Sequence, residues 1–124
     1  MNKQRPVNLD LTSISFPVTA ISSILHRITG VFLVIGIPVL LWMLATSLSS
    51  AEGFSQISQF IATGFGSLVL WAILTAIAFH IIAGVRHLLM DAGIGESLEG
   101  GMLGAKIVLV LAVLAAIGLG VWIW

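Results

Sequence analysis

The segment His80-Ile81-Ile82-Ala83-Gly84-Val85-Arg86-His87-Leu88-Leu89-Met90-Asp91 decides how this chain folds. It continues an apolar run that starts at Phe65 and has about 20 residues, which is the length that spans the hydrocarbon core of a membrane. An ionisable side chain in that core costs at least ~2.5 kcal/mol, so it usually faces protein, cofactor or water rather than lipid. If the helix ends near Leu89, His80 lies about 13 Å inside that end. We therefore expect His80 to have a partner.

Small residues surround His80 on one face of the predicted helix. Ala72, Ala76, His80 and Gly84 recur at intervals of four residues, so they form one line. Such a line favours close packing against another helix. It also leaves room for a flat, wide ligand whose metal the imidazole holds, since neutral histidine is an axial ligand of haem iron and ligand pockets are mostly apolar. A hydrogen bond from His80 to a neighbouring helix is the alternative without a ligand.

The composition is that of a membrane protein, because 59% of the 124 residues are hydrophobic and only 8% are charged. Three apolar runs are long enough to span a bilayer, at residues 28–48, 65–82 with a polar extension to 90, and 107–124. We predict an all-α membrane protein, a single domain over residues 1–124, with three transmembrane helices running up, down and up at about 19–48, 63–91 and 105–124. Because the chain has no cysteine, any iron-sulfur cluster must belong to a partner.

The segments outside these spans are predicted as follows. Residues 1–17 form a retained cytoplasmic segment, extended from residue 5 to 16, because about 27 mostly polar residues precede an apolar run that is too long for a cleaved signal. Residues 49–53 form a polar turn. Residues 54–62 form a short interfacial helix or begin the second span. Residues 92–105 contain five glycines and are expected to form a flexible loop.

The basic residues predict the orientation in the membrane. All five fall on one side of the predicted spans: Lys3, Arg5, Arg27, Arg86 and Lys106. By the positive-inside rule the N-terminus is cytoplasmic and the C-terminus lies outside. The four tryptophans lie toward the opposite side, as in an aromatic belt.

This topology brings two polar clusters to one membrane face. Ser23, His26 and Arg27 share a face of the first helix, and Arg86, His87 and Asp91 end the second. Arginine and histidine donate to carboxylates, and a serine hydroxyl can bond a quinone oxygen, so the convergence suits an anionic or carbonyl-bearing ligand. The alternative for Arg27 alone is a side chain that reaches the lipid headgroups beside two capping serines.

Three motifs carry a resemblance to a known family. They are Arg5-Pro6, Ser23-Ile24-Leu25-His26-Arg27-Ile28-Thr29-Gly30, and His80-xxx-Gly84-Val85-Arg86-His87-Leu88-x-Met90-Asp91-x-Gly93. At this separation they resemble the cytochrome b556 membrane-anchor subunits of bacterial succinate dehydrogenase, respiratory complex II, and the similarity covers essentially the whole chain.

The resemblance implies a set of sites. His80 matches an axial ligand of haem b, and the second axial histidine would come from a companion anchor subunit in a heteromeric haem-binding bundle. Ser23 and Arg27 match positions that line the ubiquinone pocket. His26 and Arg27 match positions near the haem propionates, and His87 matches a position near the haem edge or the quinone approach.

The resemblance also implies the setting. A flavoprotein subunit would oxidise succinate and an iron-sulfur subunit would pass electrons to quinone, linking the tricarboxylic acid cycle to electron transport at the bacterial inner membrane. This chain would hold no succinate-oxidising centre, and its partners would be these subunits and lipid, not nucleic acid. Two alternatives stay open: the anchor of a fumarate reductase, and a non-redox structural anchor or small transport subunit whose histidines relay protons or pair with other helices.

Overall fold

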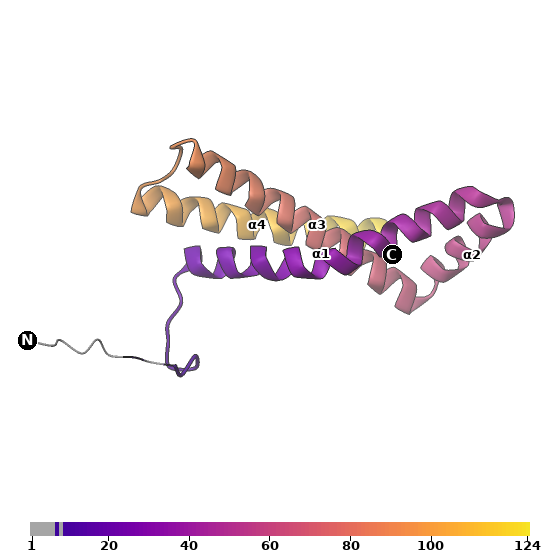
Figure 1. Ribbon diagram of the computed structural model, residues 1–124, viewed down its shortest axis with the longest axis horizontal. Helices are drawn as coiled ribbons and strands as arrows, with labels where there is room; N and C mark the ends of the chain where they lie inside the picture. The colour runs from indigo at the N-terminus through magenta and orange to yellow at the C-terminus, as the bar shows by residue number, and fades with distance from the viewer. Residues whose placement is uncertain (1–6, 8) are drawn as a thin grey trace, which may run out of the picture.

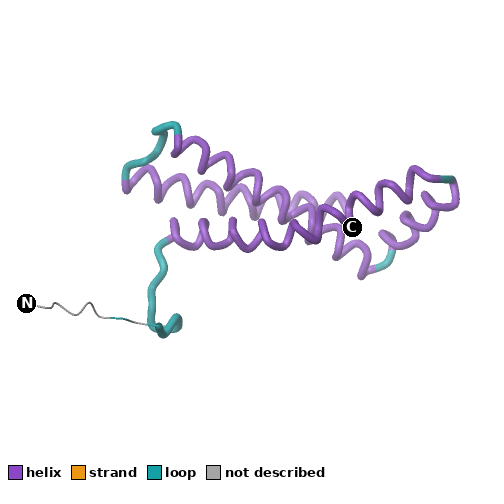
Figure 2. Tube along the Cα trace, viewed as in Figure 1, coloured by secondary structure: helices purple, strands orange, loops and turns teal. Residues whose placement is uncertain are grey.

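A computed structural model describes residue 7 and residues 9–124 of the chain. Over these residues it contains four α-helices and no strand: α1 (Val18–Ser49), α2 (Ala51–Ala62), α3 (Gly64–Asp91) and α4 (Leu98–Ile123) (Figures 1 and 2). Three of them, α1, α3 and α4, are long and apolar enough to cross a membrane, and they run alternately in opposite directions. The prediction of an all-α, three-span, up-down-up fold is confirmed.

Helix α3 packs against both other long helices. On one side, Ile73 and Ala76 of α3 form a small core with Leu33 of α1. Nearer the end of α3, Phe79 and Ala83 form a second core with Val108 of α4. Ala83 is fully buried, because its methyl group is small enough to let α4 approach closely.

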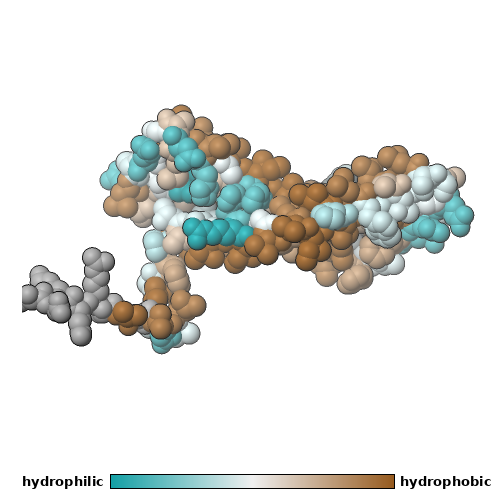
Figure 3. All heavy atoms as spheres, viewed as in Figure 1, coloured by the Kyte–Doolittle hydropathy of each residue, from teal (hydrophilic) through white to brown (hydrophobic). Residues whose placement is uncertain are grey.

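Most large apolar side chains lie outside these two cores. Val31, Val34 and Ile35 of α1, for example, are each more than two-thirds exposed, at 74%, 73% and 71%. Figure 3 shows an apolar band across the middle of the molecule and hydrophilic residues gathered toward its two ends. Apolar surface of this extent suits lipid or another apolar helix, as expected of a membrane-spanning bundle.

The segment between the first two spans forms a helix of its own. Ser50 caps α2 by accepting a hydrogen bond from the Gly53 amide at 2.9 Å, and Thr63 caps α3 by accepting one from the Gly66 amide at 2.9 Å. Thr63 has extended backbone angles, so it separates α2 from α3. Of the two predicted alternatives for residues 54–62, a separate short helix is correct. It lies back along the end of α1 (Figure 1).

The predicted flexible loop at residues 92–105 is largely wrong. The connection occupies only residues 92–97, and α4 begins at Leu98 rather than near residue 105. The Ser97 hydroxyl accepts a hydrogen bond from the Gly100 amide at 3.0 Å, and Glu99 lies in the first turn, where a negative charge is favourable. These two signals start the helix in spite of its glycines.

Those glycines allow close packing within α4. Gly101 is buried and its carbonyl accepts a hydrogen bond from Arg86 Nη2 at 3.0 Å. A Cβ atom at Gly104 would lie 3.2 Å from Arg86 Nε. A larger residue would therefore push the arginine away from α4. Gly101 and Gly104 therefore allow the close approach of Arg86, whereas the glycines of this segment were predicted to make a flexible loop.

The described part of the N-terminal segment was predicted to be extended, but it contains a turn. The Thr12 hydroxyl and the Thr12 amide both donate to the Asp10 carboxylate, at 2.6 and 3.0 Å, and these two bonds lower the pKa of Asp10. The remaining predictions for this segment, including the placement of Lys3 and of the Arg5-Pro6 motif, concern residues outside the described ones.

Candidate functional site

The three histidines of the chain gather between α1 and α3. His26 of α1 lies between two histidines of α3, with its ring centroid 4.1 Å from that of His80 and 4.8 Å from that of His87. The rings are nearly parallel, at 16° and 20°. His80 and His87 are seven residues apart, or about two helical turns, and therefore share a face of α3. All three side chains are half-buried.

His80 contacts α1 through two residues that follow His26. The Thr29 hydroxyl lies 3.1 Å from His80 Nδ1, and a Cβ atom built at Gly30 would lie 3.1 Å from His80 Cε1. The hydrogen bond to a neighbouring helix, which was the alternative without a ligand, is therefore present. It involves Nδ1, and no described residue forms a hydrogen bond with Nε2. The hydrogen bond and a ligand at Nε2 are thus compatible.

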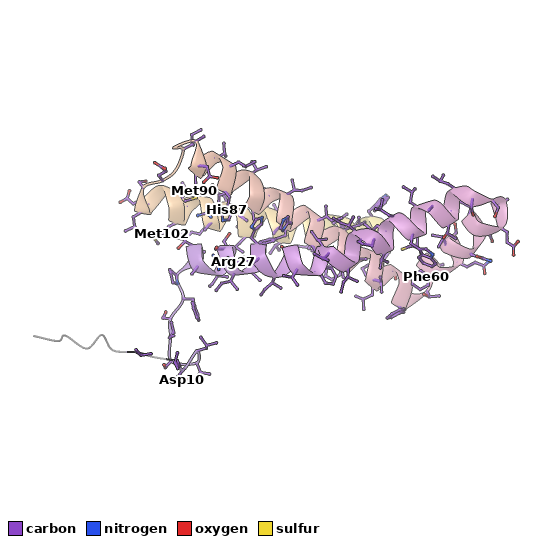
Figure 4. The ribbon with its side chains drawn as sticks, in the orientation of Figure 1. Asp10, Arg27, Phe60, His87, Met90 and Met102 are labelled. Carbon is purple, nitrogen blue, oxygen red and sulfur yellow. The ribbon has the colours of Figure 1, made fainter. Side chains whose placement is uncertain are left out.

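His87 is held by its own helix. Its Nδ1 donates to the Ala83 carbonyl at 2.8 Å, one turn earlier in α3. The ring lies on the His26 side of α3, near the end that also carries Arg27 of α1 (Figure 4). His87 thus belongs to the same cluster as His80 and His26.

Ser23 and Arg27 lie in the first turns of α1, at the same end of the bundle. Ser23 is half-buried and Arg27 is exposed. Within the described residues, no ion pair is formed by Arg27, and Ser23 makes no side-chain hydrogen bond. Both side chains are therefore free to contact a ligand or another subunit. Their neighbour Ser22 is fully buried, with a hydroxyl that has no hydrogen-bond partner among the described residues.

Arg86 does not join this cluster, although it precedes His87 in the motif. Its guanidinium reaches the opposite way, to the Gly101 carbonyl of α4. It holds α3 and α4 together at the end where the polar residues meet. Asp91 is exposed at the end of α3.

The line of small residues on α3 serves two purposes. Ala76 is buried in the core with Leu33, which is the close packing that the spacing predicted. Ala72 lines an apolar groove of about 360 Å³ between α1 and α3, together with Phe32 and Gly36. At the polar end, a Cβ atom at Gly84 would lie 3.6 Å from His26 Nε2, so the glycine leaves space beside the histidines.

The sequence indicates the three histidines, but it does not indicate that Thr29 and Gly30 also contact His80. Thr29 and Gly30 were noted only as part of a motif. A signal was available, because they lie three and four residues after His26 and therefore share its helix face. The pairing of that face with His80 depends on how α1 and α3 are aligned, which spacing within one helix does not determine.

The fold and the cluster define a class: a multi-pass, all-helical membrane protein with a histidine cluster between two of its spans. The chain belongs to the succinate dehydrogenase/fumarate reductase transmembrane subunit family, whose sequence model matches residues 1–119. The resemblance predicted from the motifs is confirmed, and the chain is a membrane-anchor subunit of that kind.

Three relatives illustrate the similarity. The succinate dehydrogenase cytochrome b556 subunit of Coxiella burnetii is 44% identical over 125 aligned residues, covering 100% of both chains. The subunit of the same name from Paracoccus denitrificans is 36% identical, covering 77% of this chain and 73% of that protein. The succinate dehydrogenase cytochrome b560 subunit of Reclinomonas americana is 36% identical, covering 92% and 83%.

The contact between Gly30 and His80 can be tested by substitution. Gly30→Val should lower the free energy of unfolding by about 1–3 kcal/mol, because the added atoms meet the His80 ring. Gly118→Val is the matched control, since a Cβ atom at that helical glycine meets nothing within 4 Å. Thermal unfolding of the purified protein in detergent measures both. Equal stability of the two variants would show that α1 does not approach His80 as described.

Proposed function

We propose that this chain is the membrane anchor of a succinate dehydrogenase that binds haem b together with a second anchor subunit and helps to form the site where ubiquinone is reduced. The observation that carries the proposal is the histidine cluster, in which the Nε2 atom of His80 is free of hydrogen bonds to any described residue. The relatives are named as cytochrome b subunits, which agrees with a haem ligand at this position.

The residues present fit a haem. His80 offers a ring nitrogen inside a membrane span, and the residues of α1 and α3 that flank it in the sequence are mostly apolar, as the walls of a haem pocket are. Arg27 offers donors, and His26 and His87 offer imidazole rings, for the haem edge or the propionates at the polar end of the same cluster. When bound, haem carries single electrons. His80 would hold its iron, and the charged end of the cluster would hold its acidic groups.

The quinone site is proposed at the first turns of α1. Ser23 and Arg27 are one turn apart and share a face. The Ser23 hydroxyl can donate to a quinone oxygen, and the Arg27 charge can stabilise the negative charge that develops on that oxygen during reduction. Arg27 lies at the polar end of the bundle (Figure 4), and Ser23 lies one turn nearer the start of α1, where water can supply the protons that quinone reduction consumes.

The proposed partners follow from what the chain lacks and from its family. A second anchor subunit would supply the other axial histidine, because His26 and His87 are assigned to the haem edge. An iron-sulfur subunit would deliver electrons near Ser23 and Arg27, since this chain has no cysteine to hold a cluster. A flavoprotein subunit would oxidise succinate. The family also includes fumarate reductase subunits, so an anchor working with net flux in the opposite direction is the second candidate.

The proposed location is the bacterial inner membrane, with the N-terminus in the cytoplasm and the C-terminus in the periplasm. Reporter fusions after Gly53 and after Trp124 test this orientation, because both sites should lie outside. A periplasm-dependent reporter such as alkaline phosphatase should be active at both sites and inactive after Asp91. Activity after Asp91 together with silence at the other two sites would reverse the orientation.

His80→Leu tests the haem assignment. We expect the reduced-minus-oxidised spectrum of the assembled complex to lose or shift its low-spin b-type bands, because leucine has no donor atom for iron. His87→Leu is the comparison, since it removes an imidazole from the same cluster without removing the proposed ligand. Unchanged bands in His80→Leu, with loss in His87→Leu, would move the axial ligand to His87.

Arg27→Leu tests the quinone site. Succinate-dependent quinone reduction should fall at least about tenfold, because a charge that stabilises the reduced oxygen is removed. Dye-linked succinate oxidation and haem content should change far less. Lys106→Leu is the control, because it removes an exposed positive charge from α4, outside the cluster. Equal quinone reduction in both variants would place the site elsewhere.

A further inference from the structure

The direction of the hydrogen bonds around Thr29 follows from the number of protons available. The Thr29 hydroxyl lies 2.9 Å from the His26 carbonyl and 3.1 Å from His80 Nδ1. A carbonyl only accepts, so the single hydroxyl proton is donated to His26. The hydroxyl oxygen must then accept from His80, which means that Nδ1 of His80 carries a hydrogen.

From this chain of bonds we infer that Thr29 is a positioning residue for haem binding: it holds His80 in the tautomer that has its hydrogen on Nδ1 and its lone pair on Nε2. The inference rests on the proposed function, in which Nε2 of His80 binds iron. In metal sites the second ring nitrogen of a ligating histidine usually donates to a fixed acceptor, which sets both the tautomer and the ring orientation. Here that acceptor comes from a different helix.

Two further contacts restrict the same ring. Gly30 follows Thr29, and the space left by its missing side chain is occupied by the His80 Cε1 edge at 3.1 Å from the Cβ position. The His26 ring stacks on His80 at 4.1 Å. One turn of α1, from His26 to Gly30, therefore determines the orientation of the His80 ring.

His87 provides a contrast within the cluster. Its Nδ1 also carries a hydrogen, but this is donated to the Ala83 carbonyl of its own helix. Its orientation therefore does not depend on Thr29. A haem bound through His87 would be insensitive to substitution of Thr29, so the experiment also discriminates between these two histidines.

Thr29→Val in the assembled complex is the first test, because valine keeps the shape and removes the hydroxyl. Haem affinity should fall about 10- to 100-fold, the usual effect of removing such a partner, with a changed low-spin spectrum. Thr29→Ser should restore both, since serine retains the acceptor. Thr75→Val is the matched control: it is the same substitution on α3, at a hydroxyl without a hydrogen-bond partner among the described residues. Parental affinity and spectrum in Thr29→Val would overturn the inference.

A chemical rescue keeps the inference testable if Thr29→Val assembles poorly. In His80→Gly, free imidazole can enter the space of the lost ring, bind iron with one nitrogen and donate from the other to Thr29. The ligand 1-methylimidazole has no such hydrogen. Imidazole should therefore restore the low-spin spectrum at a concentration about tenfold lower than 1-methylimidazole does, a difference on the scale of one hydrogen bond. The difference should disappear when Thr29→Val is added to His80→Gly. A difference of the same size in both backgrounds would overturn the inference.

The two levels of the hypothesis fail in different ways. If His80→Leu keeps the parental spectrum, His80 is not the ligand and the proposed haem site is wrong. If His80→Leu loses the spectrum while Thr29→Val retains it, the haem site stands and the positioning role of Thr29 is wrong.

Discussion

The structure depends on one constraint, which is that an ionisable or indole side chain within an apolar membrane span finds its partner inside the protein. Three such side chains of α3 find their partner on a neighbouring helix. His80 contacts the Thr29 hydroxyl of α1, Arg86 donates to the Gly101 carbonyl of α4, and Trp71 Nε1 donates to the Ala116 carbonyl of α4 at 2.8 Å. Because lipid offers little hydrophobic drive for helix association, these bonds and the small residues beside them align the bundle.

Much of this arrangement could be predicted from composition and spacing. The three apolar runs determine three spans because only a continuous helix of about 20 residues satisfies its backbone in lipid. The intervals of four around Ala76 and His80 predict a flat face on α3, and the buried Ala76 core confirms its packing role. The convergence of His26 with His87 was predicted from the antiparallel topology of the first two spans, whereas the stacking of His80 on His26 was not.

The predictions failed where a specific contact outweighed the intrinsic preference of a residue for one kind of secondary structure or hydrogen bond. Glycine has a low helix propensity, so residues 98–105 were assigned to a loop. In the structure, the Ser97 cap and the close approach of Arg86 to Gly104 outweigh that preference. Thr29 was missed for a related reason. Its hydroxyl can bond its own helix, and it does so at the His26 carbonyl, so the sequence of α1 places it on the His26 face but does not show that it also contacts His80.

The same contacts explain why the two ends of the cluster differ. His80 lies within a span, where a free imidazole rotor would be costly, so its ring is fixed by a hydroxyl, a stacked histidine and the gap at Gly30. Arg27 lies in the third turn of α1, toward the polar end of the bundle, where an exposed guanidinium can be solvated and needs no partner in this chain. A rigid metal ligand and an adaptable cation are the requirements of the haem and quinone sites proposed here. One turn of α1 takes part in both proposed sites, because His26, Thr29 and Gly30 contact His80 while Arg27, in the same turn, is exposed.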